Sequence, residues 1–125
     1  MRYLLDINVL LAAILKAHPS HSVTDAWIAK KALVTCPLSE LGFLRISTNP
    51  RAYNVSMALA RQSLEAFLAA HKVGHIPAGL PALKSKARTS DEVTDCYLGD
   101  LAACKGMKLA TLDTGITHPA AELIR

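Results

Sequence analysis

Acidic side chains stand close to the ends of several strands that the sequence predicts. Asp6 directly follows the apolar run Arg2–Leu5, and Asp113 lies just after the last clear run, Lys108–Thr111. Glu40 lies in the first turn of a helix that follows the second predicted strand. Asp95 lies near the start of the helix that precedes the last of these strands. Open parallel sheets bind ligands beyond the carboxyl ends of their strands. We therefore expect these four of the ten acids to share one rim.

Crowded carboxylates have a chemistry of their own. They repel one another, which raises their pKa values, and a bound divalent cation removes that repulsion. Carboxylate oxygens suit hard ions such as Mg²⁺ or Mn²⁺, which can activate a water molecule and stabilise charge on a phosphate. The sequence contains no Ser/His/Asp or Cys/His arrangement and no glycine-rich phosphate loop that would favour another chemistry. The acids therefore favour metal-assisted hydrolysis of a phosphate ester.

The elements that must position these acids alternate between strand and helix. Short apolar runs predict strands at Arg2–Leu5, Ala32–Cys36, Lys72–Ile76 and Lys108–Thr111. Helices are expected between them: one through about Lys16, one through Lys31, one from Pro37, one over Val55–His71 and one ending at Lys105. Residues 77–90 are expected to form a loop, and residues 118–125 a turn or short strand. This order predicts an α/β domain whose parallel sheet is covered on both faces.

Composition sets the size and class of the domain. The chain has 125 residues, of which 51% are hydrophobic and 19% charged, enough for one well-packed domain over residues 1–125. The longest apolar run, Val9–Leu15, is too short for a transmembrane helix, so we expect no membrane association. Three cysteines without a CxxC pair favour a reduced, cytoplasmic protein. The net charge of +4 weakly favours a polyanionic partner.

Four segments in a fixed order carry a resemblance to a known family. The chain resembles PIN-domain nucleases, specifically the VapC-type toxins, in the segments LLDINVLL (4–11), CPLSELGFLR (36–45), VTDCYL (93–98) and LATLD (109–113). Each segment alone is unspecific, whereas the ordered set spans most of the chain. The resemblance implies a three-layer α/β/α PIN fold with a central, mainly parallel sheet. It also implies a Mg²⁺-dependent endoribonuclease, with Mn²⁺ as a possible substitute, that a cognate VapB-like antitoxin blocks and that forms a homodimer.

The same resemblance assigns roles to individual residues. Asp6 and Asp95 would be the principal metal ligands, and Glu40 and Asp113 would complete the acidic quartet. Hydrogen bonds from two further residues would support these ligands. The supporting residues are Asn8 and Thr111.

Structural roles are also open to each of these acids. Asp6 is a good N-cap for the helix that follows it, Glu40 could complement a helix dipole, and Asp113 could serve a turn before Gly115. The other acids near the third segment are expected outside the site: Asp91 and Glu92 would complement the helix dipole, and Asp100 lies about 140° around the helix from Asp95 and should be solvated. The histidines suggest no cluster, and the cysteines are expected to pack in the core.

Basic residues are candidates for contacts with RNA phosphates. Arg45 and Arg51 flank the helix that carries Glu40, which makes them the better candidates. Further candidates are Lys84, Lys86 and Arg88. The simpler interpretation of each basic residue is a solvated side chain on the surface. Since only 5% of residues are aromatic, recognition is expected to depend on RNA shape and backbone more than on base stacking.

Three other functions compete with the ribonuclease as explanations of this sequence. A phosphatase of the haloacid-dehalogenase type would need a second acid two positions after Asp6, where this chain has Asn8. A receiver-like signalling domain would need paired acids after the first strand, which are absent. A catalytically silent PIN-fold binding module would be favoured by the loss of one acid, and all four are present. The ribonuclease is therefore the favoured interpretation.

Overall fold

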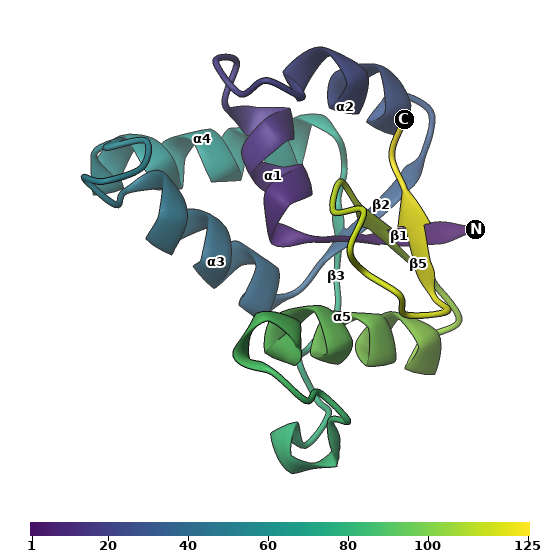
Figure 1. Cartoon of the computed structure of the whole chain (residues 1–125). Helices are drawn as coiled ribbons and strands as arrows, with labels where there is room; N and C mark the ends of the chain where they lie inside the picture. The colour runs from purple at the N-terminus through teal and green to yellow at the C-terminus, as the bar shows by residue number, and fades with distance from the viewer.

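A five-stranded, entirely parallel sheet forms the centre of the molecule. The computed structural model describes residues 1–125, and the strand order is β3-β2-β1-β4-β5 (Figure 1). The strands are β1 (Arg2–Leu5), β2 (Ala32–Thr35), β3 (Gly74–His75), β4 (Lys108–Thr111) and β5 (Ala121–Leu123). Parallel neighbours cannot be joined by a tight turn, so crossover segments, most of them helical, connect successive strands. The carboxyl ends of β1, β2 and β4, the three central strands, therefore lie side by side.

Helices cover both faces of this sheet. They are α1 (Ile7–Ile14), α2 (His21–Ile28), α3 (Pro37–Ser47), α4 (Met57–Ala70) and α5 (Val93–Cys104). The first four lie on one side and α5 lies on the other (Figure 1). Between β3 and α5, residues 77–92 form an arm that projects from the body and contains two short 3₁₀ turns, Ala82–Lys84 and Ser90–Glu92. None of these helices combines the length and the apolar character needed to span a membrane.

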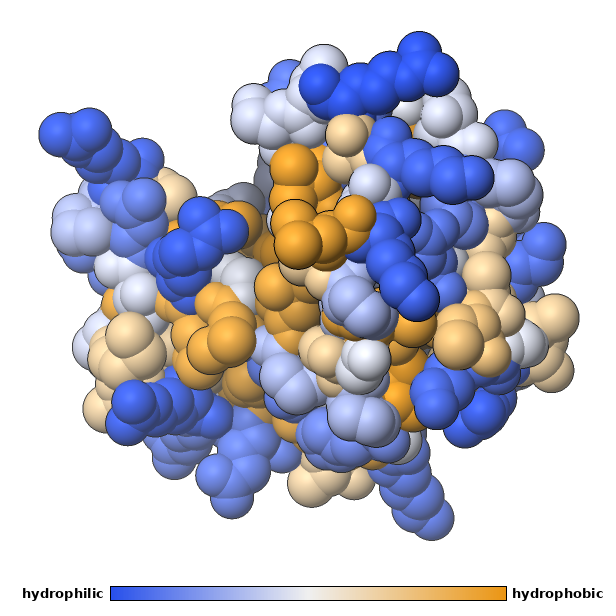
Figure 2. Space-filling model, turned by 90° about the horizontal axis from the view of Figure 1, so that it is seen from below, coloured by the Kyte–Doolittle hydropathy of each residue, from blue (hydrophilic) through white to orange (hydrophobic).

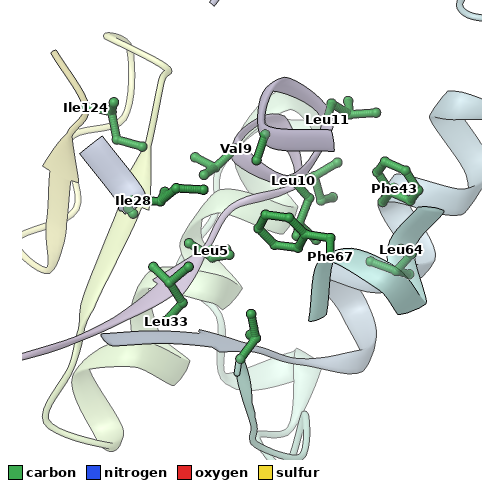
Figure 3. Close-up of a cluster of buried hydrophobic side chains, with 14 of the residues drawn as sticks. Leu5, Val9, Leu10, Leu11, Ile28, Leu33, Phe43, Leu64, Phe67 and Ile124 are labelled. Atoms are coloured by element: carbon green, nitrogen blue, oxygen red, sulfur yellow. The ribbon is translucent and has the colours of Figure 1, made fainter. Parts of the chain in front are cut away.

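The side chains of each central strand alternate between two hydrophobic clusters. Leu5, Leu33 and Ala110 belong to the larger cluster, which packs the sheet against α1 to α4 (Figure 3). Their chain neighbours Leu4 and Val34 belong to the smaller cluster, which packs the opposite face against α5. This period of two explains why the strands are apolar along their whole length, since both faces are buried. The predicted three-layer α/β/α architecture is confirmed.

Most differences from the sequence prediction concern the ends of elements. The helix expected through Lys16 ends at Ile14, and the one expected through Lys31 ends at Ile28. The last strand, left open as a turn or a strand, is β5, which pairs in parallel with β4. The strand expected over Lys72–Ile76 is reduced to two residues at the sheet edge, where only one neighbour supplies hydrogen bonds.

Candidate functional site

Asp6 lies at the centre of the carboxyl edge of the sheet. It follows β1, its backbone N–H donates to the Ala110 carbonyl, and its side chain is only 4% exposed. One carboxylate oxygen accepts the Ile7 N–H (2.8 Å), which caps α1, while the other accepts the Thr111 hydroxyl (2.8 Å). The Asp6 side chain thus caps α1 and is also held in a fixed position at the sheet edge. Asp6 is fixed from two elements, at the position where an open parallel sheet presents its ligands.

The charges of neighbouring carboxylates help to raise the pKa values of two acids at this edge. Burial first, and then the negative charges of Asp6 and Asp113, raise the pKa of Asp95 to about 6. Burial also raises the pKa of Asp6, against the hydrogen bonds from Thr111 and Ile7, and the charge of Asp113 adds to the rise. Side chains from β1, α5 and the segment after β4 therefore form one acidic cluster, defined here as Asp6, Asp95 and Asp113.

Asp113 is held by the turn that follows β4. Its N–H donates to the Thr111 hydroxyl (3.0 Å), and its own carboxylate accepts the Gly115 N–H (2.8 Å). Thr111 thus links two acids, since the same hydroxyl donates to Asp6. Asp113 itself stays exposed to solvent.

Glu40 enters the rim from α3, and Ser39 fixes the start of that helix. The buried Ser39 hydroxyl donates to the Leu5 carbonyl (2.7 Å), one residue before Asp6. The Glu40 carboxylate pairs with His75 Nε2 (3.1 Å), and not with another acid. Ser39 was not singled out from the sequence. Ser39 lies four residues before Phe43, a spacing that puts both residues on the same, buried face of the helix. That spacing is the sequence signal for Ser39.

The cluster contains no positive side chain. The only ion pairs in the chain are His75 with Glu40 and His118 with Asp100, so no lysine or arginine neutralises the cluster. Nor do three histidine, cysteine or acidic side chains converge tightly enough to form a finished metal-binding group. The carboxylates lie along the same edge of the sheet, but their oxygens do not converge on a single position. A cation bound there would have to draw the side chains closer together.

Other residues singled out from the sequence lie at different places. Asn8 is exposed on α1 and makes no side-chain hydrogen bond, whereas Thr111 is buried and bonds to Asp6. Arg45 lies in the last turn of α3 and Arg51 in the turn beyond it, both exposed. Neither arginine lines a cleft that holds an acid of the cluster.

Asp100 and His118, which the sequence does not mark as partners, meet in the structure. Asp100 is partly exposed, in keeping with the expected solvated position, and it accepts a hydrogen bond from His118 Nε2 (2.8 Å). His118 Nδ1 in turn accepts the Ala120 N–H (3.0 Å), so its ring ties the segment after Asp113 to α5. The two residues are far apart in sequence, and no local pattern marks the pair. Of the cysteines expected in the core, Cys36 is buried, whereas Cys104 is exposed.

The His118 ring requires a glycine beneath it. A Cβ atom at Gly99 would lie 2.5 Å from the Cγ atom of His118, far inside van der Waals contact. We expect Gly99→Ala to lower the free energy of unfolding by about 1–3 kcal/mol, although alanine is the better helix former. Urea denaturation would measure the loss. In a His118→Ala background the same change should cost little, and an equal cost in both backgrounds would contradict the contact.

These features define an α/β domain with an acidic cluster at the carboxyl edge of a parallel sheet. A model of the PIN domain matches residues 3–122. Ribonuclease VapC38 of Mycobacterium tuberculosis is 34% identical over 125 residues, covering 90% of this chain and 86% of that protein. Ribonuclease VapC39 of the same species is 32% identical over 133 residues, covering 96% and 94%. The chain belongs to the PIN-domain family.

A solved structure supports the fold independently. The crystal structure of VapBC2 from Rickettsia felis, bound to a DNA fragment from its promoter, contains a chain that superposes with a TM-score of 0.66. The match covers 98% of this chain and 97% of that one at 14% sequence identity. At this identity the likeness concerns the fold alone. The predicted resemblance to VapC-type PIN domains is confirmed by the sequence relatives.

Proposed function

We propose that this chain is a metal-dependent endoribonuclease that hydrolyses RNA phosphodiester bonds, and that it is the toxin of a VapBC-type toxin–antitoxin pair. The observation that carries the proposal is the acidic cluster at the sheet edge, where burial and neighbouring negative charges raise the pKa values of Asp6 and Asp95 and no lysine or arginine pairs with the carboxylates. Sequence relatives that are ribonucleases of the VapC type support the same activity.

The donor set fits a hard divalent cation. Asp6 and Asp95 would be the principal ligands of Mg²⁺ or Mn²⁺, with Glu40 and Asp113 completing the quartet. All the donors are carboxylate oxygens, which such ions prefer, and the cluster lacks a positive charge of its own. When bound, the ion would lower the pKa of a water molecule and stabilise charge on the phosphate.

The chain's own residues would hold the acids in place for this reaction. Thr111 fixes Asp6 and the turn of Asp113 through one hydroxyl, which keeps two acids in register. Ser39 holds α3, and with it Glu40, against the end of β1. Attack of water on the phosphodiester by this route would leave a 5′-phosphate and a 3′-hydroxyl. Asn8 would support the ligands through a hydrogen bond that its side chain does not make in this structure. Arg45 and Arg51 would contact RNA phosphates away from the cluster.

The partners follow from the same assignment. RNA is the substrate, a cognate VapB-like antitoxin would block the site, and the chain would act as a homodimer in the cytoplasm. A catalytically silent PIN-fold module is the alternative, and activity measurements separate the two.

Metal dependence tests the proposal directly. Purified protein incubated with a mixture of cellular RNAs and Mg²⁺ should cleave RNA, EDTA should stop cleavage, and added Mg²⁺ or Mn²⁺ should restore it. The carboxylates can hold such an ion only when it is present in excess of the chelator. Gel electrophoresis would follow the fragments, and a small phosphate ester would serve as a control for phosphatase activity. Cleavage that persists in EDTA would contradict the metal site, and absence of cleavage in every metal would favour the silent module.

A further inference from the structure

An open cleft of about 400 Å³ includes Asp95 of the acidic cluster in its lining. Its floor is α5, where Asp95 and Cys96 line it, and one wall is the segment Gly115–Pro119. The arm supplies the other wall, with the two cations Lys86 and Arg88 and one carboxylate, that of Glu92. A space of this size is within the range that holds a small ligand or one unit of a polymer. The cleft therefore joins a reactive edge to two basic side chains.

The arm is fastened to the same helix that carries Asp95. The Tyr97 hydroxyl donates to the Leu80 carbonyl (2.9 Å) and accepts the Leu80 N–H (3.2 Å). Closer to the cleft, the backbone N–H of Arg88 donates to the Glu92 carboxylate (2.9 Å). Figure 2 views the molecule from the side on which the arm projects and shows long hydrophilic side chains around apolar ones. These contacts hold Lys86 and Arg88 at a fixed place relative to Asp95.

Both basic side chains are free to bind an anion. Neither Lys86 nor Arg88 forms an ion pair, and both are exposed. The opposite wall offers the exposed Thr117, the half-buried Ile116 and the ring of His118, whose nitrogens are already engaged by Asp100 and Ala120. One wall thus supplies positive charge, and the other supplies apolar surface and a hydroxyl. A nucleotide has the matching halves: a phosphate, and a sugar with a base.

We propose that this cleft binds the nucleotide of single-stranded RNA next to the one that is cut, with Lys86 and Arg88 on its phosphate and the Ile116–His118 wall against its sugar and base. The inference rests on the proposed ribonuclease function and adds a subsite to it. Arg88 can contact a phosphate through two N–H groups, whereas Lys86 acts as a point charge. The segment Gly115–Pro119, which His118 ties to α5, is a positioning element for this subsite.

A charge-matched pair of double variants tests the subsite. Lys86→Ala/Arg88→Ala removes the two cations of the cleft, and Lys30→Ala/Lys105→Ala removes two exposed cations at the opposite edge, where β2 and β4 begin. Binding would be measured by fluorescence anisotropy with a labelled single-stranded RNA of mixed sequence, in an Asp6→Asn background that prevents cleavage. The KM for RNA cleavage would be measured without the Asp6 substitution.

The expected results differ between the two variants. The cleft variant should bind RNA at least about tenfold more weakly, because hydrogen bonds to charged groups are lost. The magnitude of the slope of log affinity against log salt should fall by roughly 0.7, since one phosphate contact on a single strand contributes about that amount. Its KM should rise while kcat changes little. The control should keep the affinity, slope and KM of the parent.

Two results would overturn the inference, and they differ from a failure of the proposed function. Equal losses in both double variants would mean a diffuse positive field without a subsite. Unchanged binding and KM in the cleft variant, with a parent that cleaves RNA, would remove the subsite and leave the ribonuclease intact. A parent that neither binds nor cleaves RNA would defeat the proposed function itself.

Discussion

Replacing Asp6 by asparagine is expected to abolish RNA cleavage while leaving the fold intact. Asp6 is the most buried acid of the cluster, and both of its oxygens are held by hydrogen bonds from Ile7 and Thr111. Asparagine keeps the shape and one carbonyl acceptor but removes the negative charge that would hold a cation. Loss of a residue that merely orients a metal ligand costs about 10–100-fold, so loss of a principal ligand should exceed about a hundredfold.

The measurement is the initial rate of RNA cleavage in Mg²⁺, compared with Asp91→Asn as the control. Asp91 is exposed on the arm and does not line the cleft, so this change removes a carboxylate away from the cluster. Circular dichroism and thermal melting would establish that both variants fold. Folded Asp6→Asn protein that cleaves RNA at the parental rate would refute the assignment of the site.

Replacing Asp95 by asparagine should have two effects of opposite sign: loss of cleavage and gain of stability without metal. Burial and the charges of Asp6 and Asp113 raise the pKa of Asp95 to about 6 in the folded protein. Between about pH 4 and pH 6 the folded chain therefore binds more protons at this site than the unfolded chain, and stability falls as the pH rises. Above that window the ionised carboxylate opposes folding. The neutral amide removes the cost.

The expected gain at neutral pH is on the order of 1 kcal/mol, because solvent screens a partly exposed group, and it should vanish near pH 4. Urea denaturation in EDTA at both pH values measures it, again with Asp91→Asn as the control. Added Mg²⁺ should reverse the order, because a ligand that binds only the folded parent stabilises it by RT ln(1 + c/Kd), where c is the free ligand concentration. A variant that is less stable than the parent in EDTA at neutral pH would contradict the crowding of the three acids.

The strands and helices follow from patterns within short stretches of the chain. The apolar runs Arg2–Leu5 and Lys108–Thr111 are strands because both faces of the sheet are covered. The amphipathic helix expected over Val55–His71 is α4, only slightly shorter. The acids after these strands could be placed at one edge of the sheet because parallel strands end on the same side. Hydrophobic periodicity is local, and it is therefore readable from the sequence.

The contacts between distant segments were not readable in this way. Glu40 faces His75, Asp100 faces His118, and Tyr97 holds Leu80, and none of these pairs is marked by spacing or residue type. The same holds for the cleft, since Lys86 and Arg88 lie on an arm whose position depends on α5. The sequence favoured Arg45 and Arg51 because they flank Glu40 along the chain, whereas the packing of the arm brings different cations beside Asp95.

The sequence by itself determined the order of elements, the α/β class and the set of acids that end up at one sheet edge. Tertiary structure decided how those acids are oriented, which of them share an electrostatic environment, and which basic side chains stand next to them. The physical reason is that hydrophobic periodicity and the order of strands and helices are expressed within short stretches of the chain. Side-chain pairing and electrostatic coupling depend on distances that exist only after the chain has packed.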